Sequence, residues 1–257
     1  MKEYILLTGA SSGIGYEMAN LLAAKKLNLI LVARTESKLQ KLQAELTDEY
    51  GIQVEYFAAD LSDVNAAISL HKAVKKENFI VTHLVNNAGV GNYGHFTDTS
   101  LEEELSMIHL NISSLVVLTK LFAQDMVSRK SGRIMNVGSV VSFLPMPYFS
   151  VYSATKAFVK AFSETLDAEL DSTGVTVISL YPGTVKTGFT TSEMQSTNLH
   201  KTKPMHPKEV AIQGVDHLLK GTGNKVVGFQ NWFNSKLPNF VPDSIMMKIK
   251  KGLASQR

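Results

Sequence analysis

The sequence predicts an α/β protein with one domain of three layers, built on a mostly parallel sheet of about seven strands. Short apolar runs rich in β-branched residues alternate with longer segments of helical character. Runs such as LNLILVA (27–33) are apolar without a break, as in strands buried on both faces of a parallel sheet. The length of 257 residues and an apolar content of 44% suit one large core.

Seven strands and six helices are expected. In chain order the strands are Tyr4–Thr8, Asn28–Ala33, Gln53–Ala58, His83–Asn86, Gly132–Val137, Val175–Tyr181 and Lys225–Gly228. The intervening helices are Gly15–Lys25, Glu36–Tyr50, Val64–Glu77, Ser100–Met126, Val151–Leu170 and Pro207–Lys220. This alternation implies helices on both faces of a parallel sheet. No repeat or linker divides the chain, so residues 1–257 are predicted to form one domain, with a substrate loop at about 187–205 and a C-terminal extension at about 231–257.

Composition excludes several classes of function. The net charge of +3 is spread along the chain, with no basic block that would indicate nucleic acid as a partner. The absence of cysteine excludes disulfides and thiolate chemistry, and the seven histidines form no metal-binding motif. The first strand starts almost at residue 1, and no apolar run reaches the roughly 18 residues of a membrane span. We therefore expect a cytoplasmic protein without a transmembrane segment, a signal peptide or a metal.

A glycine turn joins the first strand to the first helix. Gly9, Gly13 and Gly15 fall in the sequence TGASSGIG, where bare backbone can approach a ligand closely. The start of the helix offers unpaired N–H groups to a pyrophosphate, and Ser11 and Ser12 add hydroxyl donors. The turn could also be an ordinary strand-to-helix connection, since its spacing differs from the GxGxxG fingerprint. Its place after the first strand favours a dinucleotide site.

The end of the second strand bears on the choice of cofactor. An NAD site usually carries an acidic residue there for the ribose hydroxyls, but this chain has Ala33 followed by Arg34. A guanidinium suits a 2′-phosphate, so we predict that NADP(H) is preferred to NAD(H). After the third strand, the Asp60 carboxylate is predicted to accept a bond from the adenine amino group, with Leu61 beside it; a helix N-cap is the alternative for Asp60.

Six motifs in fixed order resemble the short-chain dehydrogenase/reductase family over most of the chain. They are TGASSGIG (8–15), NNAG (86–89), Asn111 in the next helix, GRIMNVGS (132–139), YSATK (152–156) and YPGTVKT (181–187). The resemblance implies a Rossmann-like fold, a nicotinamide cofactor and a homodimer or homotetramer.

The resemblance also implies a set of cofactor contacts, with Thr187 at the nicotinamide carboxamide. The set is Gly9, Ser11, Ser12, Gly13, Ile14, Gly15, Arg34, Asp60, Leu61, Asn87, Ala88, Gly89, Tyr152, Lys156, Pro182, Gly183, Val185 and Thr187. Two positions depart from the family pattern. Ser12 stands where many NADP-preferring relatives carry a basic residue, and Gly138 stands where serine is commoner.

Tyr152, Lys156, Ser139 and Asn111 are the predicted catalytic residues. Tyr152 is the proposed proton donor in reduction and the base in oxidation. Lys156 lies four residues later on the same helix face, where its charge should lower the tyrosine pKa. Ser139 is predicted to orient the substrate oxygen, and the resemblance implies that Asn111 holds a water that links Lys156 to solvent. Tyr148 is the rival phenol, but the residue four positions beyond it is a tyrosine.

The predicted substrate wall is apolar and aromatic. It comprises Val90, Tyr93, Phe96, Val141, Phe143, Leu144, Met146, Phe149, Phe189 and Met194. With no arginine cluster nearby, this lining favours a hydrophobic ketone, aldehyde or secondary alcohol. Two other functions remain open: an NADP(H)-bound sensor or scaffold with vestigial catalysis, and a membrane-surface reductase of lipids. The latter is suggested by apolar and lysine residues in the extension, which could equally be a helix docked on its own domain or on a sister subunit.

Overall fold

The computed structural model describes residues 2–189, 194, 196–198, 204–241 and 243–255. Within them lies a seven-stranded sheet of order β3-β2-β1-β4-β5-β6-β7, in which each neighbouring pair is parallel. The strands are β1 (Glu3–Thr8), β2 (Leu29–Ala33), β3 (Val54–Ala58), β4 (Ile80–Asn86), β5 (Gly132–Val137), β6 (Val175–Tyr181) and β7 (Asn224–Val226). The predicted α/β class and the Rossmann-like parallel sheet are confirmed.

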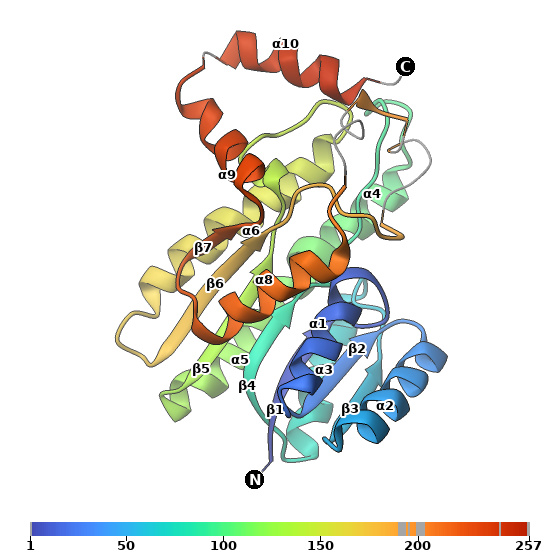
Figure 1. Ribbon diagram of the computed structural model, residues 1–257, viewed down its shortest axis with the longest axis vertical. Coiled ribbons are helices and arrows are strands. Elements are labelled where there is room, and N and C mark those ends of the chain that lie inside the picture. The colour runs from blue at the N-terminus through green and yellow to red at the C-terminus, as the bar shows by residue number, and fades with distance from the viewer. Residues whose placement is uncertain (1, 190–193, 195, 199–203, 242, 256–257) are drawn as a thin grey trace.

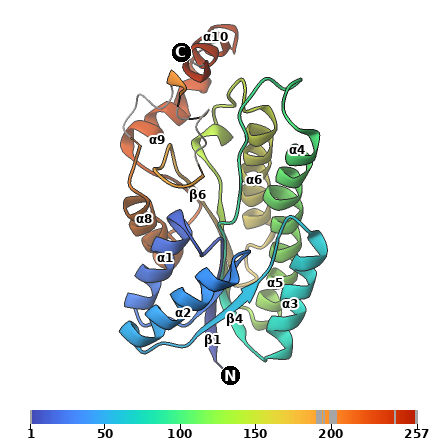
Figure 2. The same cartoon turned by 90° about the vertical axis from the view of Figure 1, so that its right-hand side faces the viewer.

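Helices cover both faces of the sheet (Figure 2). One layer contains α1 (Gly13–Ala24), α2 (Glu36–Tyr50) and α8 (Pro207–Lys220). The other contains α3 (Val64–Lys76), α4 (Leu101–Ile108), α5 (Leu115–Arg129) and α6 (Ser150–Glu169). The residues at the centre of β1 are apolar because both faces of the strand are buried. Ile5 and Leu7 belong to the core under the first layer, while Tyr4 and Leu6 belong to the core under the second.

The expected helix Ser100–Met126 is interrupted at its centre. Between α4 and α5 lies η1 (His109–Ser114), a stretch of π-helix that contains Asn111. Such a bulge widens one turn and is found mostly at functional sites. The whole segment Leu101–Arg129 is long and apolar enough to span a membrane by length and composition, but Leu118, Phe122 and Met126 pack in the core against the sheet.

The C-terminal segment begins where the last strand ends. The structure ends β7 at Val226, two residues before the expected boundary, because Gly228 turns the chain with a φ of 87° into α9 (Phe229–Lys236). A short turn, η4 (Leu237–Asn239), leads to α10 (Asp243–Ala254). Figure 1 shows α9 and α10 at the end of the molecule opposite the N-terminus.

Candidate active site

The predicted site residues gather at the carboxyl ends of the central strands. Strands β1 and β4 are neighbours in the sheet although they are not consecutive, so the chain leaves them in opposite directions. This is the switch point at which open α/β sheets bind their ligands. The glycine turn follows β1, Gly89 follows β4, and Ser139 follows β5.

The glycine turn is tightly packed against its own backbone. Gly9 and Gly13 have φ values of 67° and 58°, in the region that favours glycine. A Cβ on Gly15 would lie 2.2 Å from the Gly9 carbonyl oxygen, so the first turn of α1 can form only with glycine there. The Ser12 side chain makes no capping bond to α1. The N–H groups at this helix start thus remain available to an anionic ligand.

Thr8 and Asn87 hold the turn in place. The Thr8 hydroxyl accepts hydrogen bonds from the backbone N–H groups of Asn87 and Ala88, each at 3.0 Å. The Asn87 amide donates to the Thr8 carbonyl at 2.9 Å and to the Gly9 carbonyl at 3.3 Å. The side chain of Asn87 therefore braces the turn. Sequence analysis missed Thr8, although a hydroxyl that ends an apolar strand is a usable signal.

Arg34 and Asp60 lie at the ends of β2 and β3. Arg34 is exposed, and its charge acts on Asp60. The Asp60 carboxylate accepts bonds from the Ser62 N–H at 3.0 Å and the Ser62 hydroxyl at 2.8 Å. The first of these is the main reason that the pKa of Asp60 is lowered. The N-cap of α3 is Asp63, so the capping role considered for Asp60 belongs to a neighbour. Leu61 is buried beneath this loop.

Asn111 is fully buried in η1 and bound to its surroundings. Its amide donates to the Val90 carbonyl at 2.9 Å and to the Thr155 hydroxyl at 3.1 Å. Its Oδ1 accepts from the Val90 N–H at 3.1 Å. A Cβ on Gly89 would lie 3.1 Å from Asn111 Oδ1 and 3.4 Å from Lys156 Nζ. The side chains of Asn111 and Lys156 thus both approach Gly89 from the side where a Cβ would stand, and Asn111 fixes the loop that follows β4.

Tyr152 and Lys156 lie in the first two turns of α6. Lys156 Nζ donates to the Val137 carbonyl at 2.9 Å and lies 6.0 Å from the centroid of the Tyr152 ring. Burial lowers the pKa of Lys156 to about 8. Burial also raises the pKa of Tyr152 to about 12, and the hydrogen bond with Ser139 only partly opposes this. In the protein chain alone, the pKa of Tyr152 is therefore raised by burial, opposite to the direction expected from its spacing to Lys156.

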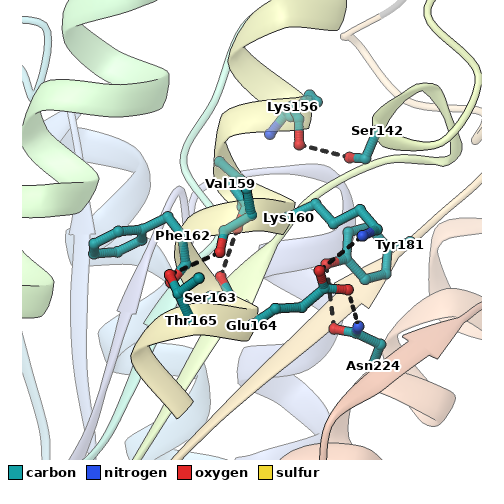
Figure 3. Close-up of polar contacts among 11 residues, drawn as sticks. Ser142, Lys156, Val159, Lys160, Phe162, Ser163, Glu164, Thr165, Tyr181 and Asn224 are labelled. Carbon is teal, nitrogen blue, oxygen red and sulfur yellow. Dashed lines mark hydrogen bonds and ion pairs between the residues drawn. The ribbon is translucent and has the colours of Figure 1, made fainter. Parts of the chain in front are cut away.

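Polar contacts hold α6 against its neighbours (Figure 3). The Ser142 hydroxyl donates to the Lys156 carbonyl at 2.7 Å. Farther along the helix, Lys160 pairs with Glu164 at 2.7 Å, and Glu164 also accepts a bond from Asn224 at the start of β7. These contacts position the helix that carries the predicted acid and its lysine.

Ser139 caps the short helix η2 (Val140–Ser142). Its hydroxyl accepts from the Val141 N–H at 3.4 Å, and Ser142 Oγ accepts from the Ser139 N–H at 3.3 Å. Packing accounts for the glycine at position 138, because a Cβ there would lie 2.5 Å from the Tyr181 ring. Gly138, which stands where serine is commoner in the family, therefore makes room for this ring.

The segment after β6 reaches back to the glycine turn. A Cβ on Gly13 would lie 3.1 Å from Thr187 Cγ2, so the two ends of the predicted cofactor site meet there. The Pro182 carbonyl accepts from the Val140 N–H at 2.9 Å. Gly183 lies against the Asn231 side chain of α9. Val185 belongs to the core under the first layer, and Ile14 packs against the same core.

An apolar cluster lies next to Tyr152. It contains Met146, Phe149, Met194 and Ala254, with Tyr93, Val141, Tyr148 and Tyr152 packed against it. Phe189 covers Tyr152, with ring centroids 5.6 Å apart. Much of the predicted substrate loop, 187–205, lies outside the described residues.

Three residues of the predicted wall are not part of this cluster. The Phe143 ring packs against the Tyr181 ring, with centroids 4.8 Å apart. Phe96 is 65% exposed, but it lines a small pocket together with Phe149 and Tyr152. Leu144 is not among the residues of the cluster. Adjacent apolar positions in an irregular loop point in different directions, which sequence alone does not show.

Sequence reasoning missed two parts of this cluster. Gly91 lies beneath Phe189, where a Cβ would come within 2.7 Å of the phenylalanine ring. Ala254, at the end of α10, accepts a hydrogen bond from the Tyr93 hydroxyl at 2.7 Å. Within the described residues, no group of three or more histidine or acidic side chains is arranged to hold a metal ion.

Comparisons with known proteins agree on the type of protein. A family model described as short chain dehydrogenase matches residues 3–198. The very-long-chain 3-oxoacyl-CoA reductase of Anas platyrhynchos is 31% identical over 258 residues, which cover 98% of this chain and 81% of the relative. The 17-beta-hydroxysteroid dehydrogenase type 3 of Rattus norvegicus is 36% identical over 212 residues, which cover 81% of this chain and 68% of the relative. A solved short-chain dehydrogenase from Sphingobium yanoikuyae in complex with NADPH has a TM-score of 0.82 at 28% identity, covering 95% of this chain and 97% of that chain.

Proposed function

Because this chain belongs to the short chain dehydrogenase family, we propose that it is an NADP(H)-dependent oxidoreductase that reduces an apolar ketone or aldehyde to an alcohol, with Tyr152 as the proton donor. The observation that carries this proposal is the meeting of Tyr152, Ser139, Lys156 and Asn111 at the switch point of the sheet, beside an apolar cluster.

The residues around the glycine turn fit a dinucleotide. The turn exposes backbone that a Cβ on Gly9 or Gly15 would obstruct, and the helix start offers free N–H groups to a pyrophosphate. Arg34 would face a 2′-phosphate, and the Lys156 ammonium would lie at the ribose of the nicotinamide. When bound, a reduced nicotinamide supplies the hydride.

The chain's own residues would manage the proton and the substrate oxygen. Ser139 donates a hydrogen bond to the carbonyl oxygen and orients it. As the hydride reaches the carbon, the Tyr152 O–H bond breaks and a new O–H bond forms on the substrate. The Lys156 ammonium stabilises the phenolate that remains and returns a proton to it, and the resulting amine takes up a proton from solvent. A tyrosine with a pKa near 12 is fully protonated at neutral pH, which favours the direction of reduction.

The apolar cluster supports the proposed class of substrate. Met146, Phe149 and Met194 offer a lining that adapts to a bulky apolar group. Two relatives are named as reductases or dehydrogenases of 3-oxoacyl-CoA and of 17-beta-hydroxysteroids. Ketones on long acyl chains and on steroid rings are therefore the first compounds to test.

NADPH oxidation with a panel of apolar ketones, aldehydes and diketones tests the proposal. We expect turnover with at least one acyl or steroid ketone, and little with charged sugars or hydroxy acids. Tight NADPH binding, seen by fluorescence, without turnover on any member of the panel would favour a sensor protein with vestigial catalysis. Activity confined to charged substrates would contradict the proposed substrate class.

Replacing Arg34 with alanine should weaken the preference for NADP(H). The loss of a charge-assisted bond to the 2′-phosphate should lower kcat/KM with NADPH by about 10- to 100-fold, since such bonds contribute about 1.5–3 kcal/mol. The value with NADH should stay within about twofold, because NADH carries no phosphate there. Steady-state kinetics with both cofactors check this. An equal fall with the two cofactors would mean that Arg34 acts on the fold instead.

The rate of reduction should fall as the pH rises through about 8. Burial lowers the pKa of Lys156 to about 8, so above this pH the ammonium that supports the phenolate becomes a neutral amine. Below this pH, both Lys156 and Tyr152 carry their protons and the rate should be constant. A profile of kcat from pH 6 to 10 measures this, and Lys156→Arg should move the fall to higher pH. A flat profile in the unmodified protein would contradict the role of Lys156.

A further inference from the structure

The exposed large apolar side chains are concentrated in the C-terminal segment, 229–255. Eight of the fifteen such side chains in the described residues belong to it. The most exposed are aromatic: Phe240 at 82%, Phe229 at 80% and Phe233 at 54%. Figure 1 shows that α9 and α10, which carry most of these residues, lie together at one end of the molecule. A gathering of this kind marks an interaction surface.

Helix α10 has apolar residues on two faces. Met246 and Ala254, eight residues apart, face the protein and are buried. Ile245, Ile249 and Leu253 follow the same spacing on another face and are 41–53% exposed. The face with Met246 and Ala254 is apolar because it docks on the domain. The face with Ile245, Ile249 and Leu253 is apolar although no other element among the described residues covers it.

The net charge of the C-terminal segment indicates which kind of partner covers its exposed apolar side chains. Residues 229–255 contain four basic residues and one acidic residue, a net charge of +3, which equals the net charge of the whole chain. The rest of the molecule therefore contributes no net positive charge. Lys236, Lys248 and Lys251 are exposed beside the apolar side chains. A second copy of this surface would repel the first, but an anionic bilayer would attract it.

We propose that α9, η4 and α10 bind the surface of an anionic lipid bilayer, with the aromatic side chains inserted and the lysines at the head groups. Phenylalanine and tryptophan with flanking lysine are the residues that interfacial segments use. The covering partner is thus a membrane surface, and the segment lies on it without crossing it.

The same segment also forms part of the predicted substrate site. Ala254 belongs to the apolar cluster beside Tyr152, and the Tyr93 hydroxyl binds its carbonyl. At the other end, Asn231 of α9 lies against Gly183 and donates to the Val227 carbonyl at 2.7 Å. A bilayer under α9 and α10 would therefore adjoin the pocket and deliver apolar ketones directly. This delivery rests on the proposed function, whereas membrane binding does not.

Sedimentation with lipid vesicles tests the binding without cofactor or substrate. We expect the protein to sediment with vesicles of phosphatidylcholine that contain about one-third phosphatidylserine, and at least about tenfold less with pure phosphatidylcholine. The variant F229S/F233S/F240S and the variant K248E/K251E should each lose at least about tenfold in binding. The matched controls Ile212→Ser and K41E/K72E, on α8, α2 and α3, should bind like the unmodified protein.

Two outcomes would overturn the proposal. One is that the unmodified protein stays in the supernatant with anionic vesicles. The other is that the serine variant changes from an oligomer to a monomer in sedimentation velocity while vesicle binding is unaffected, which would make the surface a contact between copies. A parallel assay with a water-soluble ketone reports on the proposed function alone, and there the serine variant should keep the unmodified rate.

Discussion

Replacing Tyr152 with phenylalanine should lower kcat for carbonyl reduction by about 10²- to 10⁴-fold, the usual contribution of a positioned general acid. The substitution removes the hydroxyl that hydrogen-bonds with Ser139 and supplies the proton, while the ring keeps its packing against Phe149 and Phe189. Steady-state NADPH oxidation measures the loss. NADPH affinity by fluorescence and the unfolding temperature should stay close to those of the unmodified protein.

Tyr148→Phe is the matched control for this prediction. Tyr148 is another phenol packed against the cluster, four residues before Tyr152, and its backbone has a φ of 65° that is unusual for a bulky residue. Its ring packs edge-on against His95 at 4.8 Å, and this contact survives in phenylalanine. We expect kcat within a few-fold of the unmodified value. A large loss in Tyr148→Phe with a small loss in Tyr152→Phe would exchange the roles of the two residues.

Replacing Lys156 with alanine should lower both the rate and the affinity for NADPH. The rate should fall by about 100-fold, because the phenolate loses the cation that stabilises it. The dissociation constant should rise about tenfold or more, the effect of one lost hydrogen bond from a charged group. Fluorescence titration and single-turnover reduction separate the two effects. The decline in rate at pH values above about 8 should also disappear.

Lys160→Ala controls for the general effect of removing a lysine from α6. Lys160 lies one turn later, keeps 29% of its side chain exposed and pairs with Glu164. Its removal costs one partly exposed ion pair, which contributes about 1 kcal/mol or less to stability. Rate and affinity should therefore stay near the unmodified values. If Lys160→Ala and Lys156→Ala were equally impaired, the loss would reflect the helix and not the ammonium at position 156.

The parts of the fold that depend on local pattern could be predicted. The apolar runs gave the first six strands to within a few residues, because a parallel strand buried on both faces has a distinctive composition. The glycine turn after β1 could also be predicted. Its backbone needs positive φ values at positions 9 and 13, and the glycines that allow them are visible in the sequence.

The parts that depend on tertiary contact could not be predicted. The π-helical turn at Asn111 has the same apolar spacing as an ordinary helix, so the sequence shows a single helix there. The raised pKa of Tyr152 depends on its burial by residues distant in sequence, which the spacing to Lys156 does not reveal. Phe143 lies in a loop whose direction is set by Tyr181, which is far away in sequence.

The hydrogen bond from Tyr93 to Ala254 joins an early part of the chain to a part that is synthesised near its end. The two residues are 161 positions apart, so the ribosome completes the glycine turn, β4 and α6 long before it adds the helix that closes the apolar cluster. A nascent chain can form the cofactor half of the site while its apolar half stays open to solvent. The aromatic cluster beside Tyr152 is thus the last part of the site to mature during synthesis.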